Sequence, residues 1–121
     1  MSGLRQPGRN RENVNISGTV TLTPHDLGKT FWVTDTAVIT LPTPGLCPNG
    51  GDILFINYSD TDLTVGLNEL TVTKNNLAAD SVAYSTSSEK IGGAFWAHTN
   101  GVKWAVLPLA EETQTISVTT D

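Results

Sequence analysis

The sequence has a single cysteine, Cys47, among its 121 residues. An intrachain disulfide is therefore impossible, and the fold does not depend on an oxidising compartment. Cys47 also lacks a second cysteine or a base at motif spacing, so we interpret it as a structural residue. No apolar run approaches the roughly 20 residues of a membrane-spanning helix, and none follows the first basic residue as in a secretory signal. We expect a soluble protein made inside a cell, with no membrane partner.

The chain also has little that favours helix. Its apolar residues alternate or form short β-branched runs, which are bounded by Gly, Pro, Asn and Asp. This pattern predicts an all-β fold, an antiparallel β-sandwich or jelly roll of about nine short strands. The expected strands lie at residues 19–23, 30–34, 37–41, 52–57, 62–65, 70–73, 81–85, 93–99 and 102–107, with a further extended piece at 115–119.

Basic residues are scarce outside the N-terminus. Residues 1–12 hold three Arg and one Glu, a net charge of +2, whereas residues 13–121 hold four Lys and eleven Asp or Glu, a net charge of −7, which together make −5. Phosphate contacts need clustered Lys and Arg, so an acidic body argues against a nucleic-acid partner.

The dipeptide Asn100-Gly101 lies between two apolar runs and predicts a two-residue hairpin, because both residues tolerate the positive φ of a type I′ turn. Thr99 would then oppose Val102, and Ala97 would oppose Trp104. The two faces of this hairpin would carry, respectively, the core side chains Phe95, Ala97, Thr99, Val102, Trp104 and Val106, and the side chains Trp96, His98, Lys103, Ala105 and Leu107.

The strand at 52–57 is apolar on both faces, because Ile53 and Phe55 alternate with Leu54 and Ile56. A strand of this kind is covered on both faces. One internal core cannot also cover Trp96, so we predict an oligomer interface that contains Trp96, Leu54 and Ile56.

No catalytic, cofactor or metal site is recognisable, so we expect a protein that is not an enzyme. His25 and His98 have no metal-ligand spacing. The nearest approach to a calcium site is Asn57, Asp60 and Asp62, which lack the further ligands and the glycine of the known loop. We interpret them as a polar turn.

Several short motifs follow one another between residues 17 and 109. A D-x-G-K turn precedes a strand that ends in T-L-P, a strand that begins with G-D and ends with Asn follows, and a hairpin strand with a Trp closes the series. The motif residues are Asp26, Gly28, Lys29, Thr40, Leu41, Pro42, Gly51, Asp52, Asn57 and Trp104. In these motifs the chain resembles a small β module of tailed-bacteriophage virion proteins, which occurs in capsid decoration (cement) proteins, tail fibres and baseplates. The resemblance implies a sandwich or jelly-roll trimer.

Only an extended basic arm at 1–16 and an acidic tail at 110–121 flank the expected domain at 17–109. Fibre proteins that carry such modules are usually long and contain a trimerising rod, and no such rod is present here. We therefore expect a capsid decoration protein that is made in the host cytoplasm, forms a homotrimer and binds the major capsid protein on the outside of the virion. The alternative is a tail-fibre or baseplate component that contacts host glycans.

The basic arm is too polar to form a core of its own. Its arginines, Arg5, Arg9 and Arg11, present planar donors that pair with carboxylates. We predict that they bind the capsid shell or the acidic tail of a neighbouring copy. The other interpretation is a solvated leader without a partner.

Overall fold

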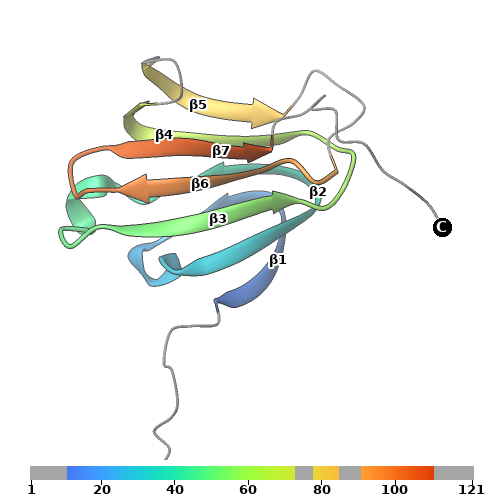
Figure 1. The fold of residues 1–121 in the computed structure, drawn as a ribbon, viewed down its shortest axis with the longest axis horizontal. Helices are drawn as coiled ribbons and strands as arrows, with labels where there is room; N and C mark the ends of the chain where they lie inside the picture. The colour runs from blue at the N-terminus through green and yellow to red at the C-terminus, as the bar shows by residue number, and fades with distance from the viewer. Residues whose placement is uncertain (1–10, 73–77, 85–90, 111–121) are drawn as a thin grey trace, which may run out of the picture.

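In the computed structural model the described residues are 11–72, 78–84 and 91–110, and for residues 67–72 and 78–80 the description covers the backbone alone. These residues form seven strands and two short 3₁₀ turns (Figure 1). The strands are β1 (Glu12–Thr21), β2 (Lys29–Thr40), β3 (Gly51–Asn57), β4 (Leu63–Val72), β5 (Ala78–Tyr84), β6 (Ala94–Thr99) and β7 (Trp104–Ala110), and the turns are η2 (Pro24–Asp26) and η3 (Pro44–Leu46). Within this part of the chain, no helix has the length and apolar character to cross a membrane.

The strands make one mixed, curled sheet in the order β1-β2-β3-β6-β7-β4-β5, and β2 also pairs with β4 (Figure 1). The pairings β2–β3, β3–β6, β6–β7, β7–β4 and β4–β2 therefore form a closed circuit. The all-β prediction is confirmed. The purely antiparallel arrangement was wrong, because β1–β2, β2–β3, β2–β4 and β4–β7 are parallel pairs.

The number of strands is smaller than predicted because two pairs of expected strands are continuous. The expected strands at 30–34 and 37–41 fall in the single strand β2, which ends at Thr40, and those at 62–65 and 70–73 fall in β4 as far as its last described residue, Val72. β2 pairs with β3 before Thr34 and with β4 after Thr36, and the register with β1 shifts opposite this point, between Ile16 and Gly18. The polar residues Thr34–Thr36 thus mark a corner inside a strand, where the pattern predicted a break. The extended piece at 115–119 lies outside the described residues.

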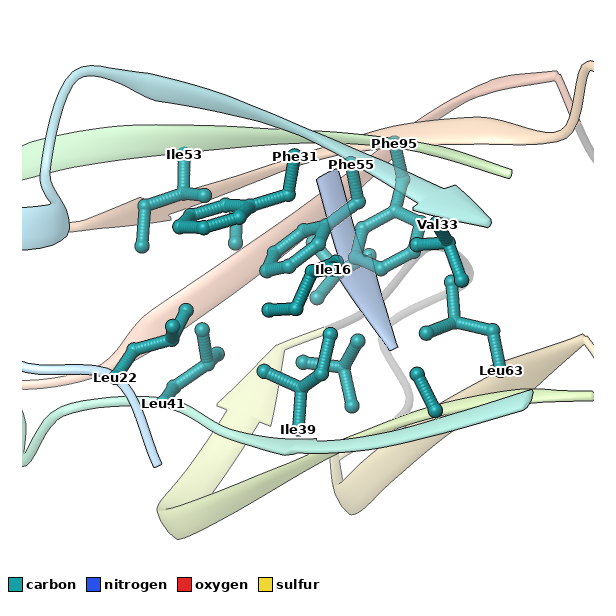
Figure 2. Close-up of a cluster of buried hydrophobic side chains, with 14 of the residues drawn as sticks. Ile16, Leu22, Phe31, Val33, Ile39, Leu41, Ile53, Phe55, Leu63 and Phe95 are labelled. Atoms are coloured by element: carbon teal, nitrogen blue, oxygen red, sulfur yellow. The ribbon is translucent and has the colours of Figure 1, made fainter. Parts of the chain in front are cut away.

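The curl of the sheet brings its two halves face to face across the core. Figure 2 shows Phe31, Ile53, Phe55 and Phe95 on one side of the core, opposite Ile39, Leu41 and Leu63 on the other. The rings of Phe31, Phe55 and Phe95 stack in a row, with centroids 5.7 and 5.1 Å apart. Trp104 is fully buried, and its indole Nε1 donates a hydrogen bond of 2.8 Å to the carbonyl of Pro42.

The β6–β7 hairpin forms, but its predicted two-residue turn was wrong. Thr99 opposes Trp104 and Ala97 opposes Val106, so the loop holds four residues, Asn100 to Lys103. The side-chain Oδ1 of Asn100 accepts hydrogen bonds from the backbone N–H groups of Val102 and Lys103. The N–H of Val102, which would pair with Thr99 in the two-residue turn, is therefore used inside the loop. The register moved by two residues, so each strand residue kept its predicted face; only Val102 left the core and is exposed.

Candidate functional site

A contiguous apolar surface lies on the side of β2, β3, β6 and β7 that points away from the core. Leu54 opposes Trp96, and Trp96 opposes Leu107 on the next strand. On the other side of β3, Ile56 opposes Trp32. We call this surface the outer face, and its residues are Trp32, Leu54, Ile56, Trp96, Ala105 and Leu107. Leu107 is 50% exposed, and the other five side chains are partly exposed.

Arg11 lies across the outer face. Its side chain leaves β1's N-terminal end on the same side as Asn13, whose Oδ1 accepts the indole N–H of Trp32. The guanidinium group then passes over β2 and β3 and comes to rest with its Cζ 4.8 Å from the centroid of the Trp96 ring, in cation–π geometry.

The guanidinium of Arg11 also donates three hydrogen bonds. Nη1 donates to Asp52 Oδ1 at 2.7 Å, Nη2 donates to the Lys29 carbonyl at 2.7 Å, and Nε donates to Thr30 Oγ1 at 3.0 Å. The Arg11 and Asp52 side chains are only 25% and 33% exposed, so the ion pair is less screened than one on an open surface. Three donors used at once hold the planar group in one orientation.

The structure therefore brings together residues that the sequence assigned to two different sites. Trp96, Leu54 and Ile56, the predicted oligomer interface, are neighbours on the outer face, and Arg11 from the predicted arm is stacked on Trp96. Arg5 and Arg9 lie outside the described residues. The sheet begins at Glu12, inside the segment predicted as the arm. Asp52 was not considered as a site residue; in the sequence only its place in the G-D motif distinguished it.

The two histidines considered for metal binding lie in separate elements of the fold. Asn57 is completely buried, and its amide Nδ2 donates to the Thr61 carbonyl at 3.5 Å, which fits the polar-turn interpretation. Within the described ranges, no group of three or more His, Cys, Asp or Glu side chains could hold a metal ion. His98 lies beside Trp96, with ring centroids 5.7 Å apart, whereas His25 is in η2.

Cys47 is buried at the end of η3, and burial raises the pKa of its thiol. A raised pKa leaves the thiol protonated at neutral pH, which disfavours reaction as a nucleophile. The structural interpretation of Cys47 agrees with this placement.

The motifs that carry the phage-module resemblance have structural roles here. Asp26 completes a capping box at η2, in which its Oδ2 accepts the Thr23 N–H and its Oδ1 pairs with Lys29 Nζ at 2.9 Å. The N–H of Gly28 donates to the Asp52 carbonyl at 2.7 Å, so the two turn motifs contact each other. These motif residues therefore stabilise the η2 turn and join it to the start of β3.

No known protein family matches this chain, and no curated protein or solved structure is significantly similar to it. The outer face, its bound arginine and the motif resemblance are consequently the observations from which a function can be argued.

Proposed function

We propose that this protein is a non-enzymatic capsid decoration protein of a tailed bacteriophage, which binds the outside of the assembled shell as a homotrimer. The observation that carries the proposal is the outer face, a partly exposed apolar surface formed by neighbouring strands of the sheet. Contiguous apolar surface on a protein often marks an interaction site, and Trp and Arg are enriched at protein–protein interfaces. The motif resemblance supports the phage context and the trimer, and it extends to a sandwich-like or jelly-roll-like arrangement of the curled sheet.

In this role the protein would stabilise the capsid shell by mass action. A protein that binds the expanded shell and has no affinity for the dissociated subunits lowers the free energy of the shell and leaves that of the subunits unchanged. Three copies joined in one trimer present three contacts to the major capsid protein at once, and this multivalency strengthens a weak individual contact. The mechanism uses no cofactor and no chemistry on a substrate.

The test uses shells of the virus that encodes the chain, prepared without it. Purified protein should co-sediment with these shells, saturate at hundreds of copies per particle, and raise the temperature at which the shells break. Cryo-electron microscopy of the saturated shells should place the added density on the capsid exterior. About a dozen or fewer copies per virion, located at the tail, would refute the decoration role.

A tail-fibre or baseplate component that contacts glycans is the second candidate, and one observation favours it. Trp32 and Tyr58 form an edge-to-face pair with centroids 5.7 Å apart, and Tyr58 is 63% exposed. Exposed aromatic rings next to polar side chains can bind the apolar face of a sugar ring while neighbouring groups accept its hydroxyls. Binding to a glycan array that is lost in Tyr58→Ala would support this candidate over the first.

A further inference from the structure

The first half of β1 lies at the edge of the sheet and contributes little to the core. Among the described strands β1 pairs only with β2, so its other side has no strand partner there (Figure 1). Between Glu12 and Ile16, only Ile16 is buried, Val14 is partly buried, and the other three side chains are exposed. Segments with few buried apolar side chains at a sheet edge open at a lower free-energy cost than the core strands do.

A joint separates this half of β1 from the second half. The register of β1 with β2 shifts between Ile16 and Gly18. Ser17 alone spans the corner for which β2 uses three residues, Thr34–Thr36. Gly18 has a φ of +76°, and nothing lies within 4 Å of the position that a Cβ would occupy there. The two halves are thus joined through a residue outside the strand pairing and a glycine in a conformation that other residues rarely adopt, so the backbone can change direction here with little steric resistance.

Arg11 fastens the other end of this half strand. Its guanidinium reaches across β2 to Asp52 of β3 and Trp96 of β6, two strands with which β1 does not pair. We call these two contacts the Arg11 latch. The Arg11 and Asp52 side chains are partly exposed, so dissolved salt weakens the attraction between them. The segment is therefore held by a polar, salt-sensitive contact at one end and can turn at the other.

We propose that residues 11–16 form a strap, which turns about Ser17 and Gly18 and is held closed by the Arg11 latch. In the closed state, which the structure shows, the strap places the guanidinium over the Trp96 ring at 4.8 Å and covers the edge of β2 from Lys29 to Val33. In the open state the Trp96 ring and this edge are uncovered. The strap thereby controls how much of the outer face a partner can contact.

The consequence for binding rests on the proposed function, because it requires the outer face to be an interaction surface. The opening itself is a property of the isolated chain. It is measured without shells or any other partner, so the strap and the decoration role can fail separately.

Amide hydrogen exchange of the full chain, followed by NMR at one protein concentration, tests the strap. In the wild type the hydrogen-bonded amides of residues 12–16 should be at least about tenfold less protected than those of residues 18–21 in the same strand. Arg11→Gln should lower the protection of residues 12–16 by at least about a further tenfold, because a charge-assisted pair and a ring contact are lost. It should leave residues 18–21 within about twofold of the wild type, which a general loss of stability would not do.

Further variants separate the latch from a change in net charge. Asp52→Asn removes the partner's charge and should increase exchange in the same residues, 12–16. Adding it to Arg11→Gln should have little further effect, because the two side chains act as one contact. Lys103→Gln is the matched control, since it also removes one positive charge, from an exposed loop position, and it should leave residues 12–16 unchanged. Added salt should increase exchange of residues 12–16 in the wild type and not in Arg11→Gln.

Three results would overturn the proposal. The first is equal protection of residues 12–16 and 18–21 that persists in Arg11→Gln, which would make β1 one fixed strand. The second is an equal increase of exchange from residue 12 to residue 21 in Arg11→Gln, because the whole strand would then open without a joint. The third is the same effect of Lys103→Gln and Arg11→Gln on residues 12–16, which would reduce the latch to net charge.

Discussion

Replacing Trp104 by Phe tests how much one buried hydrogen bond from β7 contributes to the stability of the fold. Trp104 is fully buried and its indole N–H donates to the Pro42 carbonyl at 2.8 Å. Phenylalanine keeps an aromatic ring but lacks the donor, so the buried carbonyl loses its partner, which costs about 1–3 kcal/mol. The smaller ring also leaves a cavity, which adds roughly 1 kcal/mol. We expect a loss of about 2–4 kcal/mol, which a domain of typical stability, about 5–15 kcal/mol, survives.

Trp32 provides a matched control for this substitution. Its indole N–H also donates one hydrogen bond, to Asn13 Oδ1 at 3.0 Å, but the bond is exposed and water can replace it. Trp32→Phe should therefore lower the free energy of unfolding by no more than about 0.5 kcal/mol.

Urea unfolding followed by far-ultraviolet circular dichroism measures both variants without relying on tryptophan emission. All samples must have one protein concentration, because association with a second copy would add to the apparent stability. Equal losses for the two variants, or a loss below about 1 kcal/mol for Trp104→Phe, would refute the argument that burial of the Pro42 hydrogen bond decides the effect.

Two predictions concern titratable groups. Partial burial of Asp26 raises the pKa of its carboxyl, but the hydrogen bond from the Thr23 N–H and the charge of the Lys29 ammonium outweigh burial, so the pKa is lowered overall. The ionised Asp26 side chain therefore stabilises the fold above the ordinary pKa of 3.8, and this stabilisation is lost as the pH falls through the lowered pKa. Thermal melts should show Asp26→Asn less stable than the wild type by about 1 kcal/mol at neutral pH, with the difference shrinking in acid, and a constant difference would contradict this. Burial raises the pKa of the Cys47 thiol above its ordinary value of 9.0, so the wild type should lose stability as the pH rises beyond that value, while Cys47→Ala, melted over the same range, should not show this loss. Parallel pH dependence of the two proteins above this value would show that the thiol is not the cause.

Alternation along the strands predicted which residues face the core, because side-chain direction depends only on local backbone geometry. Ile53, Phe55, Ala97 and Trp104 are buried as expected. The prediction survived even the error in the hairpin loop, since a shift of two residues preserves the face of every strand position.

The strand partners could not be predicted in the same way. β2 pairs with three other strands, all in parallel, and each contact joins segments that are distant in sequence. From local preference, a polar triplet such as Thr34–Thr36 predicts the end of a strand. In the structure it lies at a corner within β2, and the strand continues because β3 pairs with one half of it and β4 with the other. Only the three-dimensional closure of the sheet distinguishes these two outcomes.

The candidate surface was predicted in part. The sequence analysis grouped Trp96, Leu54 and Ile56 because a strand that is apolar on both faces must be buried on both. The structure places these three residues side by side. The position of Arg11 was not foreseen, because a polar segment rich in Gly and Pro gives no pattern from which a side-chain contact across three strands could be derived. Asp52, which holds Arg11, was visible only as part of a turn motif.

The corner in β2 has a consequence for how the chain folds. The first half of β2 can make its pairing with β3 only after β3 has docked, and the second half can pair with β4 only after β4 has docked. The β6–β7 and β4–β5 hairpins, in contrast, join strands that follow one another in the sequence. Parallel pairs between distant segments require loops to close before any contact compensates the lost entropy, which slows folding. We therefore expect the hairpins to form early and β2 to dock last, as the strand whose arrival makes the transition cooperative.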